Sequence, residues 1–144
     1  MKIQKAKINN LLEINKLNKK YFKEIRDFRK VLEDKNNYFY ICVEEERIIG
    51  FSGFHYQAWN NSACILNIFI HPNFRRQGYA SKLINYLIKE ARKTKARTII
   101  AEAPSLSNAL AFYLKNKFRI CGYNDRYYNN RGKEKAIFLS YDLK

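Results

Sequence analysis

At 144 residues the chain is long enough for one domain with a hydrophobic core and too short for two comfortable ones. Hydrophobic residues make up 47% of it, which indicates a globular protein and excludes an intrinsically disordered one. Its 28 lysines and arginines against 13 acidic residues give a formal net charge of +15, and such a field attracts polyanions, phosphorylated ligands and acidic surfaces. We therefore expect a single domain over residues 1–144.

The cysteines and the apolar runs exclude several other classes of protein. Cys42, Cys64 and Cys121 are odd in number and lie in apolar stretches, which is typical of small buried hydrophobic residues and not of a disulfide framework. No Cys/His cluster has the spacing of a zinc site, so we expect no metal. No apolar run is long enough to span a bilayer, and no signal-like segment is present. We therefore expect a reduced, cytoplasmic protein without membrane contact.

The first half of the chain predicts strands, two helices and a hairpin. Residues 2–8 alternate polar and apolar side chains, which predicts a strand, and residues 9–22 and 23–34 carry apolar side chains at helical spacing. Residues 38–56 are rich in aromatic and β-branched side chains and predict two strands around an acidic turn. The continuous apolar run at residues 63–71 is typical of a central strand buried on both faces.

The second half alternates helices and strands. One apolar stripe predicts a helix over residues 81–92, followed by a strand over 97–103 and a helix over 108–117. Residues 118–123 and 134–143 predict two closing strands. This order predicts an α/β domain with a mixed sheet, whose middle is bracketed by two strand–helix crossovers.

The segment at residues 71–80, HPNFRRQGYA, joins the central strand to the apolar-striped helix. Helix N-termini present unpaired N–H groups that bind anions, and Gly78 lets the backbone bend there and approach a ligand. Arg75 and Arg76 add positive charge. With one glycine the segment has neither the P-loop nor the dinucleotide-binding pattern. Its residues alone therefore fit either an anion-binding turn or a solvated arginine-rich loop.

Two motifs together resemble the GNAT (Gcn5-related) N-acetyltransferase superfamily. Residues 75–80, RRQGYA, match that family's pattern of Arg or Gln, two variable residues, Gly, one variable residue, then Gly or Ala. Residues 108–118, NALAFYLKNKF, resemble its later helix motif, although Lys117 stands where the family has Gly. The order of predicted elements also resembles the family's from end to end. The resemblance implies the GNAT fold, a mostly antiparallel twisted sheet of about seven strands splayed at its centre and flanked by about four helices.

The resemblance also implies that acetyl-CoA is the co-substrate. Main-chain N–H groups of the glycine-containing loop would hold its pyrophosphate, and the central strand would pair with its pantetheine arm as with a neighbouring strand. The implied acetyl-CoA contacts are Ile68, Phe69, Ile70, Arg75, Arg76, Gln77, Gly78, Tyr79, Ala80, Ser81, Asn108, Phe112 and Tyr113.

Acetyl transfer to an amine needs a base for the ammonium and an acid for the departing thiolate. Tyr113 occupies the family's position for the general acid, whereas its spacing alone also fits simple packing. Glu102, at the end of a predicted strand, is our candidate base, with solvation of a strand end as the alternative. We expect direct transfer without an acetyl-cysteine intermediate, and we expect structural roles for His55 and His71.

The acceptor amine has two candidate classes, and a nucleic-acid-binding function is an alternative to acetyl transfer. Residues 65–84 and 126–139 resemble the RimI-like protein N-terminal acetyltransferases, which implies a protein N-terminal α-amine, peptide contacts from Tyr127 and Tyr128, and transient ribosome contact. The two tyrosines fit packing of a long hairpin equally well. Residues 102–128 are also similar to streptothricin and other small-amine acetyltransferases, which favours an antibiotic of aminoglycoside or streptothricin type, or a polyamine. Cations interleaved with aromatic residues suit a nucleic-acid-binding module as a more distant alternative.

Overall fold

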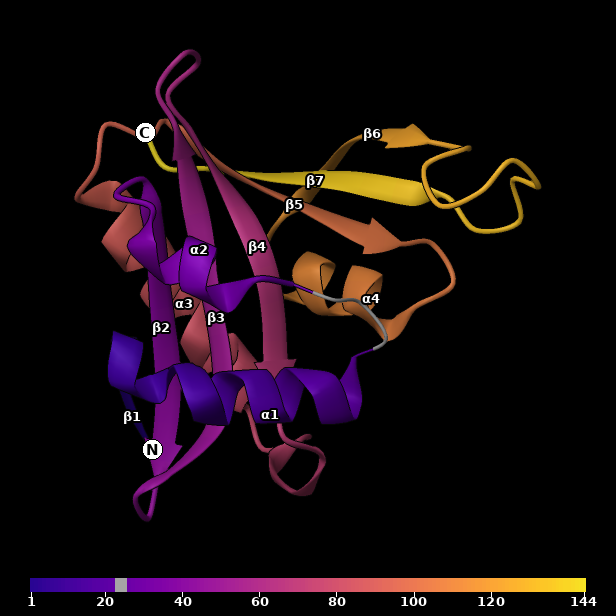
Figure 1. Cartoon of the computed structure of the whole chain (residues 1–144). Coiled ribbons are helices and arrows are strands. Elements are labelled where there is room, and N and C mark those ends of the chain that lie inside the picture. Colours follow the sequence, from indigo (N-terminus) through magenta and orange to yellow (C-terminus); the bar gives the residue numbers. More distant parts are fainter. Residues whose placement is uncertain (23–25) are drawn as a thin grey trace. The chain divides into compact units, whose positions relative to one another are not determined.

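The computed structural model describes residues 1–22 and 26–144. Within these residues, four α-helices accompany a seven-stranded sheet whose order is β1-β2-β3-β4-β5-β7-β6 (Figure 1). The elements are β1 (Lys2–Lys5), the 3-10 helix η1 (Ile8–Asn10), α1 (Leu11–Tyr21), α2 (Phe28–Glu33), β2 (Asn37–Glu44), β3 (Arg47–Gln57), β4 (Ser62–Ile70), the 3-10 helix η2 (Pro72–Phe74), α3 (Tyr79–Arg92), β5 (Thr98–Pro104), α4 (Asn108–Lys115), β6 (Arg119–Asn124) and β7 (Ala136–Asp142).

The sheet is mixed and mostly antiparallel. Strand β2 pairs antiparallel with β1 and β3, and β7 pairs antiparallel with β5 and β6. Strands β4 and β5 run parallel, with residues 62–64 opposite residues 98–100. The predicted α/β class, the mixed sheet and the numbers of strands and helices are therefore confirmed.

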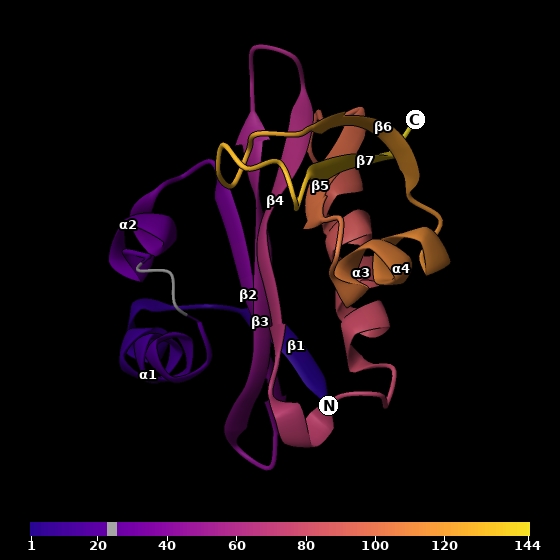
Figure 2. The same ribbon diagram turned by 90° about the vertical axis from the view of Figure 1, so that its right-hand side faces the viewer.

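The chain forms two compact units that are interleaved along the sequence. The first unit contains residues 1–56 and 66–87, and the second contains residues 57–65 and 88–144. In the first unit, α1 and α2 cover one face of β2 and β3, and the start of α3 covers the other (Figure 2).

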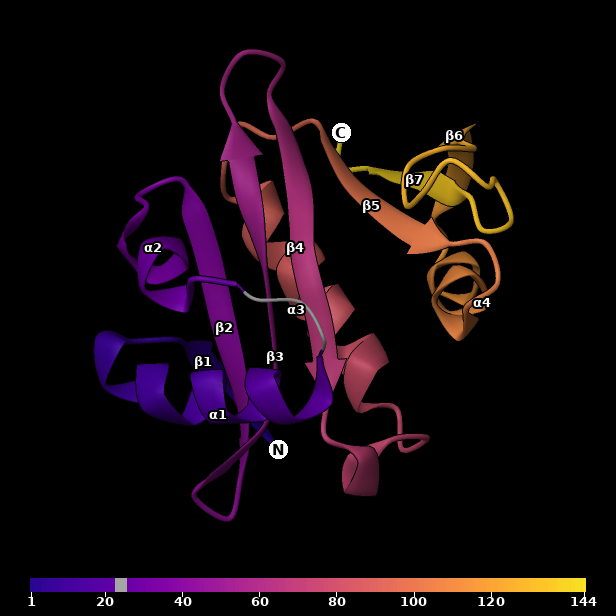
Figure 3. The same ribbon diagram turned by 45° about the vertical axis from the view of Figure 1, so that its right-hand side comes forward.

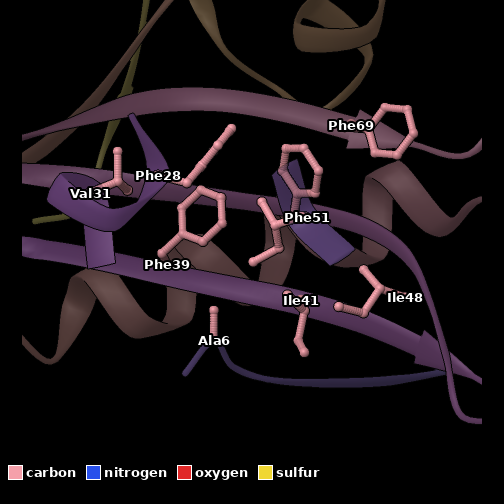
Figure 4. Close-up of a cluster of buried hydrophobic side chains, with 9 residues drawn as sticks. Ala6, Phe28, Val31, Phe39, Ile41, Ile48, Phe51 and Phe69 are labelled. Carbon is pink, nitrogen blue, oxygen red and sulfur yellow. The ribbon is translucent and has the colours of Figure 1, made fainter. Parts of the chain in front are cut away.

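An aromatic core fills the α1/α2 side of the first unit. Phe28, Phe39, Phe51 and Phe69 are each at most 2% exposed, and their neighbouring rings lie 5.1–5.7 Å apart (Figure 4). Burying one such side chain stabilises the fold by about 1.5–3 kcal/mol. On the α3 side, Ile70 packs with buried Cys42 of β2, Ile49 of β3 and Leu83 of α3. The end of β4 is therefore packed on both faces, immediately before the loop of residues 71–78 that carries Arg75 and Arg76.

The second unit is built from β5, β7, β6 and α4. Ala101 and Ala103 of β5 are buried, whereas Glu102 between them is exposed, as the alternation of a strand requires. Figure 3 shows α4 next to the end of β5. Tyr113 of α4 and Phe118 after it are each 3% exposed, and their rings lie 5.2 Å apart.

Helix α4 ends in a left-handed residue that is not glycine. Lys117 has φ +69°, its N–H donates to Leu114 O at 3.0 Å, and the N–H of Phe118 donates to Tyr113 O at 3.0 Å. These two bonds and the Tyr113–Phe118 ring contact make a Schellman motif. The turn that the family's glycine would serve is thus formed with a lysine.

Replacing Lys117 with Gly should therefore stabilise the protein by about 1 kcal/mol, because glycine adopts a positive φ without a steric penalty. Thermal unfolding followed by circular dichroism should show Tm rising by about 2–4 °C. Lys115→Gly, a substitution within the helix, is the matched control and should lower Tm. A lower Tm for Lys117→Gly would contradict this account of the turn.

The structure corrects two predicted boundaries and one burial prediction. The strand predicted over residues 2–8 ends at Lys5, because the 3-10 helix η1 begins at Ile8. The helix predicted over 23–34 is observed from Phe28, after the capping residue Asp27, and residues 23–25 lie outside the described part. The central strand is not buried on both faces along its length, since residues 64–68 of β4 are half-buried.

The cysteines also differ from the prediction that all three are buried. Cys42 is buried and Cys64 half-buried, but Cys121 is exposed because β6 is the last strand of the sheet and most of its residues face solvent. Burial raises the pKa of the Cys42 thiol to about 12 and also raises the pKa of Cys64.

Alkylation at mildly alkaline pH should therefore modify Cys121 first and Cys64 more slowly, because the thiolate is the reactive form. Cys42 should react only on unfolding. Peptide mass spectrometry of a time course in native buffer and in denaturant measures the order. Equal rates at Cys42 and Cys121 in the native protein would contradict the structure.

Candidate active site

Strand β4 departs from regular alternation just before its end. Leu66 and Phe69 pack on the same α1/α2-side core although they are three residues apart, while Ile68 packs on the opposite, α3 side. The Ser52 hydroxyl donates to the main-chain carbonyl of Asn67. Among the described residues, the buried Oδ1 of Asn67 has no hydrogen-bond partner. The half-buried segment of β4 therefore carries an acceptor that the fold leaves unsatisfied.

The loop after β4 is braced by its own side chains. The N–H of His71 donates to Ile49 O at 2.7 Å, which fixes the start of the loop against β3. Arg75 Nε donates to Ile70 O at 2.8 Å, and Gln77 Nε2 donates to Asn73 O at 3.3 Å. Arg75 thus fastens the loop to the strand in addition to contributing charge.

Two left-handed residues shape the turn into α3. Arg76 has φ +61° and Gly78 has φ +82°, so successive peptide planes change direction twice within three residues. Alternation of right- and left-handed residues aims neighbouring N–H groups at one point and makes an anion-binding concavity. Apart from Gly78 and its two chain neighbours, no heavy atom of the described residues lies within 4 Å of the position that a Cβ on Gly78 would occupy, so the turn is open there.

Helix α3 begins at Tyr79, directly after this turn. The first N–H groups of a helix have no partner within it and bind anions, with the positive end of the dipole behind them. Burial, and then the neighbouring Glu44 carboxylate, raise the pKa of the Tyr79 phenol, which therefore stays neutral beside the turn. The first unit thus brings together residues 68–70 and 75–81, and their arrangement can hold a diphosphate.

Tyr113 lies inside the second unit. Its ring packs between those of Phe112 and Phe118, with centroids 5.2 Å away on each side. Burial, and then the negative charge of Glu102, hold the pKa of its phenol well above the usual range. The hydroxyl therefore keeps its proton and is suited to act as an acid.

Glu102 is the second titratable group of this unit. It is exposed on β5, and the Tyr128 hydroxyl donates to its Oε2 at 2.9 Å. Partial burial, this hydrogen bond and the charges of Glu102 and Glu134 raise the pKa of the Tyr128 phenol. Asn108 is exposed at the start of α4. The second unit thus brings together Glu102, Tyr113 and Tyr128.

Both histidines have polar contacts within the fold, and the structural roles expected for them remain a prediction. The Tyr21 hydroxyl and His71 Nε2 are 3.2 Å apart, and His71 Nδ1 accepts from Asn73 N at 3.2 Å. His55 Nδ1 lies 2.6 Å from Asn37 Oδ1.

Sequence reasoning missed three of these features. The Glu102–Tyr128 hydrogen bond joins residues far apart in the sequence, and the unsatisfied Asn67 oxygen follows from the irregularity of β4. No sequence pattern predicted the positive φ of Arg76 either, since arginine rarely adopts this conformation.

The structure of residues 1–22 and 26–144 shows no group of three or more His, Cys, Asp or Glu side chains placed to hold a metal ion. Nor does any helix in this described part have the length and hydropathy to cross a membrane.

A family model described as the acetyltransferase (GNAT) family matches residues 7–118. No curated protein matches the sequence. Among solved structures, the ribosomal-protein-S18-alanine N-acetyltransferase from Escherichia coli is 20% identical at a TM-score of 0.86, covering 99% of this chain and 94% of its own.

Two other similar structures bear the names of small-molecule enzymes. A protein from Bacillus anthracis str. Ames, described as a streptothricin acetyltransferase in complex with acetyl coenzyme A, is 26% identical at a TM-score of 0.76 and covers 86% of this chain and 72% of its own. An aminoglycoside 6'-N-acetyltransferase complexed with coenzyme A is 16% identical at a TM-score of 0.83, with coverage of 100% and 98%.

Proposed function

Because the chain belongs to the acetyltransferase (GNAT) family and is an acetyl-CoA-dependent N-acetyltransferase, we propose that its acceptor is the α-amine of a protein N-terminus. The observation that carries the proposal is the placement of Tyr127 and Tyr128. They lie side by side on the β6–β7 connection, with ring centroids 5.1 Å apart, and Tyr128 reaches the carboxylate of Glu102. Aromatic side chains that carry a hydroxyl suit contact with an extended peptide next to a base.

The similarity in fold to the S18-alanine enzyme, which extends over nearly the whole of both chains, supports this acceptor. A cytoplasmic location and transient contact with the ribosome belong to the same proposal, since the net charge of +15 favours approach to a polyanion.

Acetyl-CoA would bind through main-chain N–H groups and side chains. N–H groups of residues 76–80 would receive the pyrophosphate, with the positive charge of Arg75 and Arg76 behind them. The pantetheine arm would pair with the main chain of β4. The remaining side chains of the proposed binding site are Ile68, Phe69, Ile70, Ser81, Asn108, Phe112 and Tyr113.

The reaction would be a direct transfer. Glu102 takes a proton from the ammonium, and the neutral nitrogen attacks the thioester carbon to form the C–N bond. A main-chain N–H of residues 68–70 stabilises the oxyanion, the C–S bond breaks, and Tyr113 donates its proton to the thiolate. The exposure of Glu102 and the raised pKa of Tyr113 suit these two roles.

A small-molecule amine is the second candidate acceptor, favoured by the similarity to the streptothricin and aminoglycoside enzymes. Such acceptors are polycationic, and the net charge of +15 opposes their approach.

Acceptor panels distinguish the two classes. We expect kcat/KM for peptides beginning with Ala, Ser or Met to exceed that for spermidine or an aminoglycoside by at least about tenfold, a difference of about 1.4 kcal/mol. Product should be quantified by mass spectrometry, because exposed Cys121 would itself consume a thiol reagent. Faster turnover of the aminoglycoside or spermidine would overturn the N-terminal acceptor in favour of the second candidate.

A further inference from the structure

The connection between β6 and β7, residues 125–135, is hydrogen-bonded to the residue that follows β5. The N–H of Lys135 donates to Ser105 Oγ at 2.9 Å, and the N–H of Ser105 donates to Lys135 O at 2.8 Å. These two bonds hold the end of the connection at the residue that follows β5. The connection therefore returns to the sheet three residues beyond Glu102.

The connection is also braced internally. Gly132 has φ +71°, a Cβ there would meet the end of the Arg126 side chain, and Lys135 Nζ donates to Gly132 O at 3.4 Å. The ring of Tyr127 meets Phe138 of β7 edge-on at 6.0 Å, and the Tyr127 and Tyr128 rings lie at 83° to each other. A braced segment therefore presents the Tyr128 hydroxyl.

That hydroxyl donates to Oε2 of Glu102 at 2.9 Å. The groups that face this pair are Tyr113 from α4, Tyr127 from the same connection, and Glu134 close to β7. Partial burial, and then the hydrogen bond to Glu102 and the charges of the two carboxylates, raise the pKa of the Tyr128 phenol, so the phenol keeps its proton and acts as a donor to Glu102. One carboxylate oxygen is thus held, and Oε1 keeps its capacity to accept a proton.

We propose that Tyr128 is a positioning residue for Glu102, whose hydroxyl holds the carboxylate in one orientation while the other oxygen takes the proton of the acceptor ammonium. The inference rests on the proposed role of Glu102 as base. The proton moves from the acceptor nitrogen to Oε1, the Tyr128 bond to Oε2 persists, and no electrons are transferred. Tyr128 thereby acts through Glu102, in addition to any contact with the acceptor.

Tyr128→Phe tests this role because it removes the hydroxyl and keeps the ring. We expect kcat to fall by about tenfold, as for loss of one hydrogen bond to a charged group, with KM for the acceptor changed less than about twofold. Tyr123→Phe is the matched control, since it removes an exposed tyrosine hydroxyl from β6 of the same unit and should change both constants less than about twofold. A raised KM with unchanged kcat for Tyr128→Phe would show a substrate contact alone and overturn the positioning role.

A double-mutant cycle with Glu102→Gln separates this inference from the proposed function. If Tyr128 acts through Glu102, Tyr128→Phe should cost less than about twofold in the Glu102→Gln background. Multiplicative losses in kcat would overturn the positioning role and leave Glu102 as base. An unchanged kcat for Glu102→Gln alone would overturn Glu102 as base and the inference with it.

A third measurement tests the contact between Tyr128 and Glu102 without an assay of enzyme activity. Near-ultraviolet titration of Glu102→Gln, compared with Glu102→Gln/Tyr128→Phe, isolates the ionisation of Tyr128. We expect Tyr128 to ionise at a lower pH than in the wild type, because the carboxylate that raises its pKa is gone. An unchanged titration of Tyr128 would overturn the contact itself.

Discussion

Replacing Tyr113 with Phe should lower kcat for acetyl transfer by about 100-fold, the lower end of the effect of removing a general acid. The ring stays in the same aromatic packing between Phe112 and Phe118, so the dissociation constant of acetyl-CoA should change less than about twofold. Steady-state kinetics and calorimetric titration with acetyl-CoA measure the two quantities.

Tyr141→Phe is the matched control for this substitution. Tyr141 packs against Phe118 with ring centroids 5.5 Å apart, and its replacement likewise removes one phenol hydroxyl from the second unit. It should leave kcat within about twofold. If Tyr113→Phe weakened acetyl-CoA binding as much as it lowered kcat, Tyr113 would have a packing role.

Because the Tyr113 phenol is buried, the stability of the folded protein depends on pH in the alkaline range. The folded pKa of Tyr113 lies above its unfolded value of about 10, so its contribution to stability is fully present below about pH 10 and is lost as pH rises through the folded pKa. Tyr113→Phe has no proton to lose there. The free energy of unfolding of the variant, measured by denaturant titration, should therefore fall less than that of wild type in this alkaline range.

Replacing Gly78 with Val should raise the dissociation constant of acetyl-CoA by about ten- to hundredfold, as for loss of one hydrogen bond to a charged group, about 1.5–3 kcal/mol. Two effects add. A β-branched residue is strained at φ +82°, and its side chain would fill the open space at the turn, where we propose that the pyrophosphate binds. Calorimetric titration with acetyl-CoA measures the change.

Gly122→Ala is the control for loss of a glycine. The nearest atom to a Cβ at Gly122 is in the Phe138 side chain at 3.8 Å, an ordinary contact, so acetyl-CoA binding should be unchanged. If Gly78→Val bound acetyl-CoA as tightly as wild type, the turn would not be part of the cofactor site.

The order of helices and strands was predictable because the local spacing of apolar residues differs between helices and strands. The apolar stripe predicted over residues 81–92 is present in α3, where it buries one face of the helix, and the strand predicted over residues 97–103 is β5. Residues 75–80 were singled out on a single glycine and two arginines, and the positive φ of Gly78 agrees with that reading.

What could not be predicted depends on contacts between distant segments. The exposure of Cys121 follows from the position of β6 at the sheet edge, which an apolar run does not encode. The hydrogen bond from Tyr128 to Glu102 depends on how the β6–β7 connection folds back, and this is fixed by Ser105 and Lys135. The spacing of apolar residues along the chain predicts neither the exposure of Cys121 nor this hydrogen bond.

Transfer of a labelled acetyl group from acetyl-CoA to a peptide N-terminus, under single-turnover conditions, tests the central claim most directly. We predict that the label appears on the peptide α-nitrogen with wild type, without a labelled protein intermediate, and about 100-fold more slowly with Tyr113→Phe. Label that stays on acetyl-CoA with every amine acceptor, or equal rates for wild type and Tyr113→Phe, would contradict the account.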